Sequence, residues 1–255
     1  MPAPTNKFKQ ALKNGEKQIG CWIGLADSYC AEIAASAGFD WLLVDGEHAP
    51  NDLRSMLTQL QIIEKSNSSA AVRLPIGETW MIKQALDAGA QTILVPMVES
   101  AEQARKLVKA CHYPPNGVRG VGASLARASN FGGIPDYLTT ADEQICLLVQ
   151  VESQAGMDAL DDILAVEGID GVFIGPADLA ADMGYLGSPK EPKVISAIEN
   201  AISKIAASDK AAGILTLDET FANRCMALGA TFVAVGIDVT AYANAMRNLA
   251  SKFKS

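Results

Sequence analysis

The sequence predicts a (β/α)8 barrel in which residues 1–255 form a single domain. Eight short runs of β-branched and aliphatic residues recur along the chain, and each is too continuously apolar for a sheet with one face in water. Helical patterns alternate with these runs, as expected for a parallel sheet. The length of 255 residues suits α/β barrels, which often reach roughly 200 to 250 residues as one domain.

The elements are expected in a regular order. A short amphipathic helix opens the chain near residues 6–14. The strands are then expected at 19–24, 41–45, 69–74, 92–97, 145–151, 171–175, 212–216 and 231–236. The helices are expected at 28–37, 51–65, 79–88, 100–111, 154–166, 191–208, 218–228 and 238–252. Gly89 and Gly229 stand just past two of these helices, where glycine commonly ends a helix.

Two segments depart from the simple alternation. Residues 113–140 are rich in Gly and Pro and form a connection too long for an ordinary barrel loop, and such loops are usually functional. Residues 176–190 begin at a Gly-Pro step and are consistent with a short helix followed by a loop.

Composition excludes several classes of protein. The formal net charge is −8 with acidic and basic residues interspersed, which argues against nucleic acid as a partner. No stretch approaches the roughly 20 apolar residues of a membrane span, and the first residues lack the apolar core of a signal peptide. The five cysteines form no Cys-x-x-Cys pair and are interpreted as reduced, small hydrophobic residues. A cytoplasmic location is therefore expected, with no nucleic acid or membrane partner.

Polar residues fall at the carboxyl ends of several predicted strands, where barrels of this type place their active sites. Strand two ends in Asp45, Glu47 and His48, and strand three ends at Arg73. Strand five carries Gln150 and Glu152, and strand six leads through Gly-Pro to Asp178. This mixture suits a hard metal ion and an anionic substrate.

Glu152 and Asp178 are the best candidate metal ligands, because two carboxylates with positions left for water and substrate commonly hold magnesium or manganese. An N-cap or a salt bridge at a strand end is the alternative. Glu47 and Glu99 are rival carboxylates near strand ends.

Arg73 leaves a buried strand, and its planar guanidinium suits a carboxylate or a developing enolate oxygen, although a structural ion pair is an equal alternative. His48 follows Asp45 by three residues, so the two can form an acid/base dyad in which the carboxylate orients the imidazole; a surface histidine is the alternative. Gln150 points to the same side of strand five as Glu152.

The glycine-rich segment 117–128 lacks the spacing of a phosphate-binding loop. It is expected to be a flexible active-site loop that bears Arg119 and Arg127. Strands seven and eight are followed by acids and not by paired glycines, which disfavours a phosphorylated substrate.

Several longer strings are distinctive. They are the segments 39–50 (FDWLLVDGEHAP), 91–98 (QTILVPMV), 119–122 (RGVG), 125–128 (LARA) and 171–179 (GVFIGPADL). Through them the chain, over about residues 7 to 250, resembles the metal-dependent class II pyruvate aldolases of the HpcH/HpaI family, which include 4-hydroxy-2-oxoheptanedioate aldolase.

The resemblance implies a barrel assembled as a homo-hexamer with the last helix exchanged between paired subunits. It implies that Glu152 and Asp178 bind a divalent ion, Mg2+, Mn2+ or Co2+, which pyruvate chelates, and that Gln150 positions the ligands. Backbone groups of Gly175, Pro176, Ala177 and Asp178 would hold the pyruvate carboxylate.

The same resemblance assigns roles in the reaction. Arg73 would stabilise the enolate oxygen, and His48 would transfer a proton together with a carboxylate. Asp45 matches a position beside His48. Asp87 matches an aspartate that reaches this pair from a neighbouring subunit.

The implied reaction is the reversible cleavage of a 4-hydroxy-2-oxo acid into pyruvate and an aldehyde, with succinate semialdehyde as the natural expectation. Residues 130–133 (NFGG) and strand seven differ from close relatives, and these departures bear on recognition of the aldehyde. One alternative is a 2-keto-3-deoxy sugar acid as substrate. A Schiff-base mechanism is disfavoured, because no lysine lies in or immediately after a predicted strand. A ligand-binding barrel without catalysis is the remaining alternative.

Overall fold

The apolar strands pair side by side in chain order and close on themselves. The computed structural model describes residues 1–254, and its sheet is a closed barrel in which every neighbouring pair of strands is parallel. The strands are β1 (Gln18–Ile23), β2 (Trp41–Asp45), β3 (Ser69–Arg73), β4 (Thr92–Val95), β5 (Cys146–Val151), β6 (Gly171–Ile174), β7 (Ala211–Leu215) and β8 (Ala230–Ile237). The predicted (β/α)8 barrel is confirmed.

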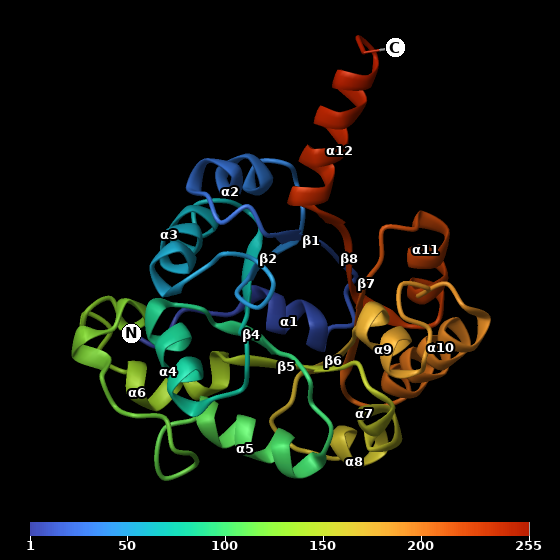
Figure 1. Ribbon diagram of the computed structural model, residues 1–255. Helices are drawn as coiled ribbons and strands as arrows, with labels where there is room; N and C mark the ends of the chain where they lie inside the picture. The colour runs from blue at the N-terminus through green and yellow to red at the C-terminus, as the bar shows by residue number, and fades with distance from the viewer. Residues whose placement is uncertain (255) are drawn as a thin grey trace.

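Helices follow the strands and surround the barrel (Figure 1). They are α1 (Lys7–Lys13), α2 (Ser28–Ala35), α3 (Leu53–Ile63), α4 (Thr79–Ala88), α5 (Ala101–Cys111), α6 (Tyr137–Thr140), α7 (Gln154–Asp158), α8 (Leu160–Leu164), α9 (Pro176–Asp182), α10 (Pro192–Ala206), α11 (Glu219–Ala227) and α12 (Asp238–Ser251). Three short 3-10 helices are η1 (Ala123–Leu125), η2 (Arg127–Ser129) and η3 (Asp142–Gln144). The expected glycine ends hold at Gly89 and Gly229, which both have a φ of 107°.

The barrel interior is filled by aromatic rings. The ring of Phe8, on α1, lies 5.5 Å from that of Trp41 and 6.0 Å from that of Phe232. Gly20 and Gly213 make room for these rings, since a Cβ at either position would lie 2.2 Å from the facing aromatic side chain. α1 therefore closes the amino-terminal end of the barrel, and the opposite end remains free for a site.

Strand alternation continues the inward-facing set into polar residues at the carboxyl ends. Leu43 and Ala71 belong to the interior cluster, so Asp45 and Arg73, two residues further along β2 and β3, also face inward. The register pairs Asp45 with Arg73 directly. The polar side chains at the mouth are thus positioned by the pleat of the strands.

α12 stands away from the barrel, with the C-terminus at its outer end (Figure 1). None of its residues is buried, and Tyr242, Met246 and Leu249 are each about half or more exposed. An apolar helix face is unfavourable in water. Such an exposed face is expected of a helix that packs on another subunit.

Two connections differ from the sequence expectation. The helix expected at 154–166 is broken at Ala159 into α7 and α8. The connection 113–140 is not structureless: it contains η1, η2 and the whole of α6, and Tyr113 and Tyr137 anchor it in a small apolar cluster with Ala3. This second core explains how so long a connection stays ordered.

The composition led to two further expectations, one on membrane spans and one on the cysteines. No helix in the described residues is long and apolar enough to cross a membrane. The five cysteines, all within the described chain, are free, and four of them are buried. The four buried cysteines pack as small apolar side chains in the core.

Candidate active site

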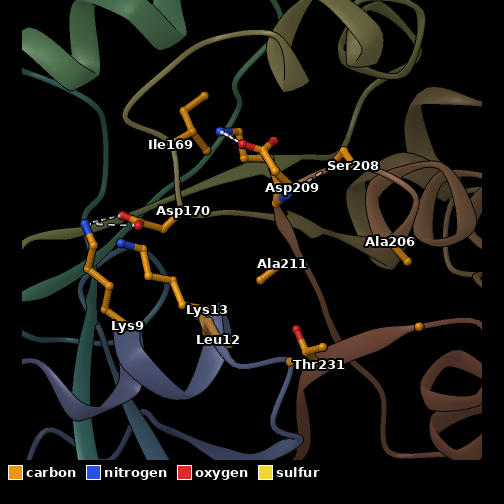
Figure 2. A pocket seen from close by; sticks show the side chains of 13 residues that line it. Lys9, Leu12, Lys13, Ile169, Asp170, Ala206, Ser208, Asp209, Ala211 and Thr231 are labelled. Atoms are coloured by element: carbon orange, nitrogen blue, oxygen red, sulfur yellow. Dashed lines mark hydrogen bonds and ion pairs between the residues drawn. The ribbon is translucent and has the colours of Figure 1, made fainter.

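A cavity of about 340 Å³ opens at the carboxyl ends of the strands and gathers most of the expected site residues. Its lining includes Asp45, His48, Arg73, Gln150, Glu152, Gly175, Pro176, Ala177 and Asp178. A second cavity, of about 390 Å³, lies at the closed end of the barrel, where Lys9 is paired with Asp170 (Figure 2). In this second cavity Lys9 pairs with Asp170 and Lys210 with Asp209. The mouth cavity is the candidate active site, because it gathers the expected residues at the carboxyl ends of the strands.

Glu152 is a buried carboxylate at the end of β5. It is 2% exposed and accepts hydrogen bonds from the backbone N–H of Met97, at 3.0 Å, and from the side-chain amide of Gln150. Burial raises the pKa of Glu152 to about 7; the two donors oppose this shift, and the charges of Asp178 and Glu47 add to it. The Glu152 carboxylate is therefore fixed by two hydrogen-bond donors, neither of which carries a positive charge to balance it.

Two backbone features position Glu152. Met97 has a φ of +54°, in the left-handed region that is uncommon for a side chain other than glycine, and this turns its N–H toward the carboxylate. Gly175 lies against the same group, since a Cβ there would stand 2.3 Å from Glu152 Oε2. Neither role is visible in the sequence.

Asp178 lies in the first turn of α9 and is exposed at the cavity wall. Among the backbone groups expected to hold a substrate carboxylate, Gly175 donates its N–H to Val151 O at 3.1 Å, and Pro176 has no N–H. The first N–H groups of a helix have no partner within it. The donors left at this wall are therefore the N–H groups of Ala177 and Asp178.

Arg73 is nearly buried and is held by two acids. Its Nε and Nη2 donate to the two oxygens of Asp45 at 2.8 and 2.7 Å, and its Nη1 lies 2.7 Å from Glu47 Oε2. The guanidinium also stacks over Trp22 at 5.3 Å. Burial alone would raise the pKa of Asp45, but the hydrogen bonds and charge of Arg73 outweigh it and lower that pKa.

The expected dyad between Asp45 and the imidazole of His48 is not formed. Asp45 binds Arg73 and accepts the backbone N–H groups of Glu47 and His48, at 3.0 and 3.5 Å. The acid beside the ring is Glu47, whose Oε2 lies 3.9 Å from His48 Nε2. Burial raises the pKa of Glu47, against the opposing charges of Arg73 and His48. Asp45 therefore shapes the loop, and the His48 side chain is left 67% exposed.

The donor set fits a divalent cation. Gln150 Oε1 is buried and has no hydrogen-bond partner among residues 1–254, and it lies next to a carboxylate whose pKa rises from burial and from neighbouring acids. Such an oxygen is costly to bury unless a cation or water meets it. No group of three or more His, Cys, Asp or Glu side chains within residues 1–254 is arranged to hold a metal by itself. A cation here would thus need oxygens from water or substrate besides Glu152 and Asp178.

Three of the residues expected at or near the site lie elsewhere within this chain. Asp87 pairs with Arg119 at the far end of α4 and does not line the mouth cavity. Arg127 binds Glu64 and the carbonyl of Ala88. The segment 117–128 is therefore not a loop over its own barrel mouth, because both arginines are anchored to neighbouring helices.

The rival carboxylate Glu99 accepts a hydrogen bond from Ser153 at 2.7 Å and is absent from the cavity lining. Trp22, which the sequence interpretation overlooked, does line the cavity. Its inward position follows from alternation along β1, so the signal was present.

The fold and the mouth together indicate a barrel enzyme whose cavity brings two carboxylates, Glu152 and Asp178, beside an arginine. Comparisons with known proteins agree. Residues 18–245 match the family described as HpcH/HpaI aldolase/citrate lyase. The chain is 58% identical to the hydroxypyruvate/pyruvate aldolase of Roseovarius nubinhibens, over 100% of this chain and 99% of that protein.

Two further comparisons extend this result. The chain is 56% identical to the 4-hydroxy-2-oxo-heptane-1,7-dioate aldolase of Escherichia coli, over 97% of this chain and 95% of the other. A crystal structure of a family protein from Burkholderia cenocepacia superimposes with a TM-score of 0.93 at 38% identity, covering 98% of this chain and 100% of that one. The chain belongs to the HpcH/HpaI aldolase/citrate lyase family, and it is an aldolase, a carbon–carbon lyase.

Proposed function

We propose that the protein is a divalent-cation-dependent pyruvate aldolase that reversibly cleaves a 4-hydroxy-2-oxo acid into pyruvate and an aldehyde. The observation that carries the proposal is the buried pair of Glu152 and the unpartnered Gln150 oxygen, beside Asp178 and Arg73 in one cavity. Relatives at 56 and 58% identity bear the names of aldolases acting on pyruvate, hydroxypyruvate and 4-hydroxy-2-oxo-heptane-1,7-dioate.

Glu152 and Asp178 would hold the cation, Mg2+, Mn2+ or Co2+, with Gln150 as a supporting oxygen. When bound, such an ion supplies positive charge that polarises the 2-oxo acid and stabilises the enolate formed from it. The backbone N–H groups of Ala177 and Asp178 orient the substrate carboxylate.

Arg73 holds the oxygen on which charge develops. A guanidinium has five N–H groups. Asp45 accepts hydrogen bonds from two of those on Arg73, and Glu47 lies at ion-pair distance from Nη1, so Arg73 keeps N–H groups for a substrate oxygen. The same two acids and the Trp22 ring fix the guanidinium before substrate arrives, which is how preorganised donors lower a barrier.

His48 removes the proton of the 4-hydroxyl during cleavage and returns it to the aldehyde oxygen during synthesis. Its exposed ring at the rim of the cavity has the freedom that a proton-transfer group needs. The neighbouring subunit supplies Asp87 as the carboxylate that orients this ring.

The aldehyde component meets an apolar wall made by Trp22, Leu215, Ile237 and Val239. Arg73 is the only Lys or Arg in the described lining of the cavity. Succinate semialdehyde carries a distal carboxylate, which would meet no Lys or Arg besides Arg73 in this described lining. This observation favours the second candidate substrate, a 2-keto-3-deoxy sugar acid, which yields a neutral hydroxyaldehyde on cleavage. Relative cleavage rates on the two substrate types distinguish the candidates.

The assembly proposed is a hexamer in which α12 packs on a paired subunit. The support is the exposed apolar face of α12, which contacts little of its own barrel. Sedimentation equilibrium measures the subunit number directly.

The decisive experiment follows exchange of the pyruvate methyl protons with deuterated water. Exchange is expected with added Mg2+ or Mn2+, and it is expected to stop on chelation and in the Glu152→Ala/Asp178→Ala double variant. Exchange that survives both would contradict the proposal. Trapping of pyruvate by borohydride would instead reveal a Schiff base.

A further inference from the structure

Arg119 is a completely buried arginine with one carboxylate partner. Its exposed fraction is 0%, and its Nη2 lies 2.7 Å from Asp87 Oδ1. The guanidinium stacks on the ring of Tyr113 at 4.4 Å. Its Nε and Nη1 have no hydrogen-bond partner in the described part of the chain. Burying a guanidinium so incompletely paired is costly, so the arrangement has a role beyond packing.

The pairing fixes one oxygen of Asp87, Oδ1, and the other, Oδ2, takes no part in it. The side chain of Asp87 is 26% exposed, and its Oδ2 faces Gly122, where a Cβ would lie 3.8 Å away. Val118 and Val121 on the same segment are 57 and 64% exposed. A fixed carboxylate oxygen is therefore presented beside exposed apolar side chains, as at the edge of a protein interface.

Asp87 has no route to the mouth of its own barrel. It lies near the carboxyl end of α4, and in a (β/α)8 barrel the helices run opposite to the strands, so this end is remote from the mouth. His48, in contrast, is a rim residue whose ring is 67% exposed and whose closest acid within the chain stands 3.9 Å away. Within one subunit the two residues therefore stay apart, and a second copy of the chain would have to bring them together.

We propose that Arg119 is a positioning residue: it holds the Asp87 carboxylate so that its free oxygen reaches the partner subunit's His48. The inference rests on the proposed function, in which Asp87 acts across the interface, and extends it to the residue that determines where Asp87 points. Lys83, one turn earlier on α4, lies near Gly120, and Tyr137 is also close to the guanidinium. These groups leave Arg119 as the cation that contacts Asp87.

The test uses mixed oligomers of full-length chains. Two differently tagged variants are co-expressed, the doubly tagged assemblies are isolated, and aldol cleavage is measured. The mixture of the His48→Ala chain with the Asp87→Asn chain is expected to recover about a quarter of the wild-type rate. This fraction is the random-assembly expectation for a site shared by two subunits. His48→Ala with Arg119→Met is expected to recover a similar rate. Asp87→Asn with Arg119→Met is expected to recover none, because no subunit then supplies a positioned carboxylate.

Several outcomes overturn the inference. Recovery from Asp87→Asn with Arg119→Met would show that Arg119 acts apart from Asp87. Failure of His48→Ala with Asp87→Asn to recover would show that Asp87 is not shared. An inactive wild-type protein would contradict the proposed function itself, so the two failures are distinguishable.

Two further variants separate positioning from folding. Arg119→Lys keeps the charge but loses the planar fork, so it is expected to retain part of kcat with an unchanged KM. Arg127→Met is the matched control, because Arg127 also anchors this segment to α4 but binds the carbonyl of Ala88 and not Asp87. It is expected to lower the melting temperature and yet to recover activity when mixed with Asp87→Asn. Failure of that mixture would indicate that any loosening of the segment suffices, against a specific role for Arg119.

Discussion

Replacing Glu152 by glutamine is expected to stabilise the cation-free protein at alkaline pH. The pKa of Glu152 is raised from 4.5 to about 7, chiefly by burial. Below about pH 4.5 the carboxyl is protonated in the folded and unfolded chains alike and contributes nothing. Between pH 4.5 and 7 the unfolded chain loses the proton that the folded chain keeps, so the free energy of unfolding falls as pH rises.

The magnitude follows from the size of the shift. At about 1.4 kcal/mol per pH unit, the raised pKa corresponds to a loss of at most about 3 kcal/mol above pH 7. Glutamine cannot ionise, so the variant avoids this loss. It also keeps the acceptor for the Met97 N–H, and a rotated Gln150 amide would offer its unpartnered oxygen to the new amide group.

Urea unfolding at one protein concentration, with chelator, measures the effect. The wild type is expected to lose stability from pH 5 to 8, and Glu152→Gln to lose less, so that the curves diverge by up to about 3 kcal/mol. Saturating Mn2+ at pH 8 is expected to restore the wild type only, by about 3 kcal/mol at one hundred times the dissociation constant. Identical pH dependence in both proteins would refute the reasoning.

Three other predictions concern the same cavity. Gly175→Ala places a methyl group 2.3 Å from Glu152 Oε2, so calorimetry is expected to show about a 10- to 100-fold loss of Mn2+ affinity; unchanged affinity would mean that the carboxylate can move aside freely. Arg73→Lys loses the fork that Asp45 holds, and kcat/KM for cleavage is expected to fall by about 100-fold or more; near-normal kinetics would limit Arg73 to a structural ion pair. Pyruvate is expected to bind only after a divalent cation, so heat released on titration into chelated protein would contradict the proposed site.

The sequence predicted the architecture well because barrel strands carry a strong signal. Strands buried on both faces read as continuous apolar runs, and the two-residue period then determines which polar residues face inward. Arg73, Gln150 and Glu152 could be placed at the mouth on this basis alone. The break at Ala159 could not, because a five-residue helix and the start of a longer one look alike in sequence.

The pairing of side chains was harder to predict than their location. Asp45 stands three residues before His48, and proximity along the chain favoured that pair. In the barrel, however, Asp45 is in register with Arg73, 28 residues away, and a bidentate pair with a guanidinium is the stronger contact. The conformation of Met97 and the close approach at Gly175 depend on tertiary packing, which no local pattern records.

The carboxylates at the mouth couple the binding of a proton, a cation and an anionic substrate to one another. Arg73 already balances part of the charge of Asp45 and Glu47, so Glu152 and Asp178 add to an excess of negative charge around the cavity. An anionic substrate is repelled from such a site until a cation compensates it. A proton on Glu152 relieves the same excess, and because one carboxylate cannot hold both tightly, proton and cation compete for it. If Glu152 holds the cation as proposed, the burial that raises its pKa is therefore expected to make cation binding depend on pH near neutrality, and with it the binding of any anionic substrate that needs the cation.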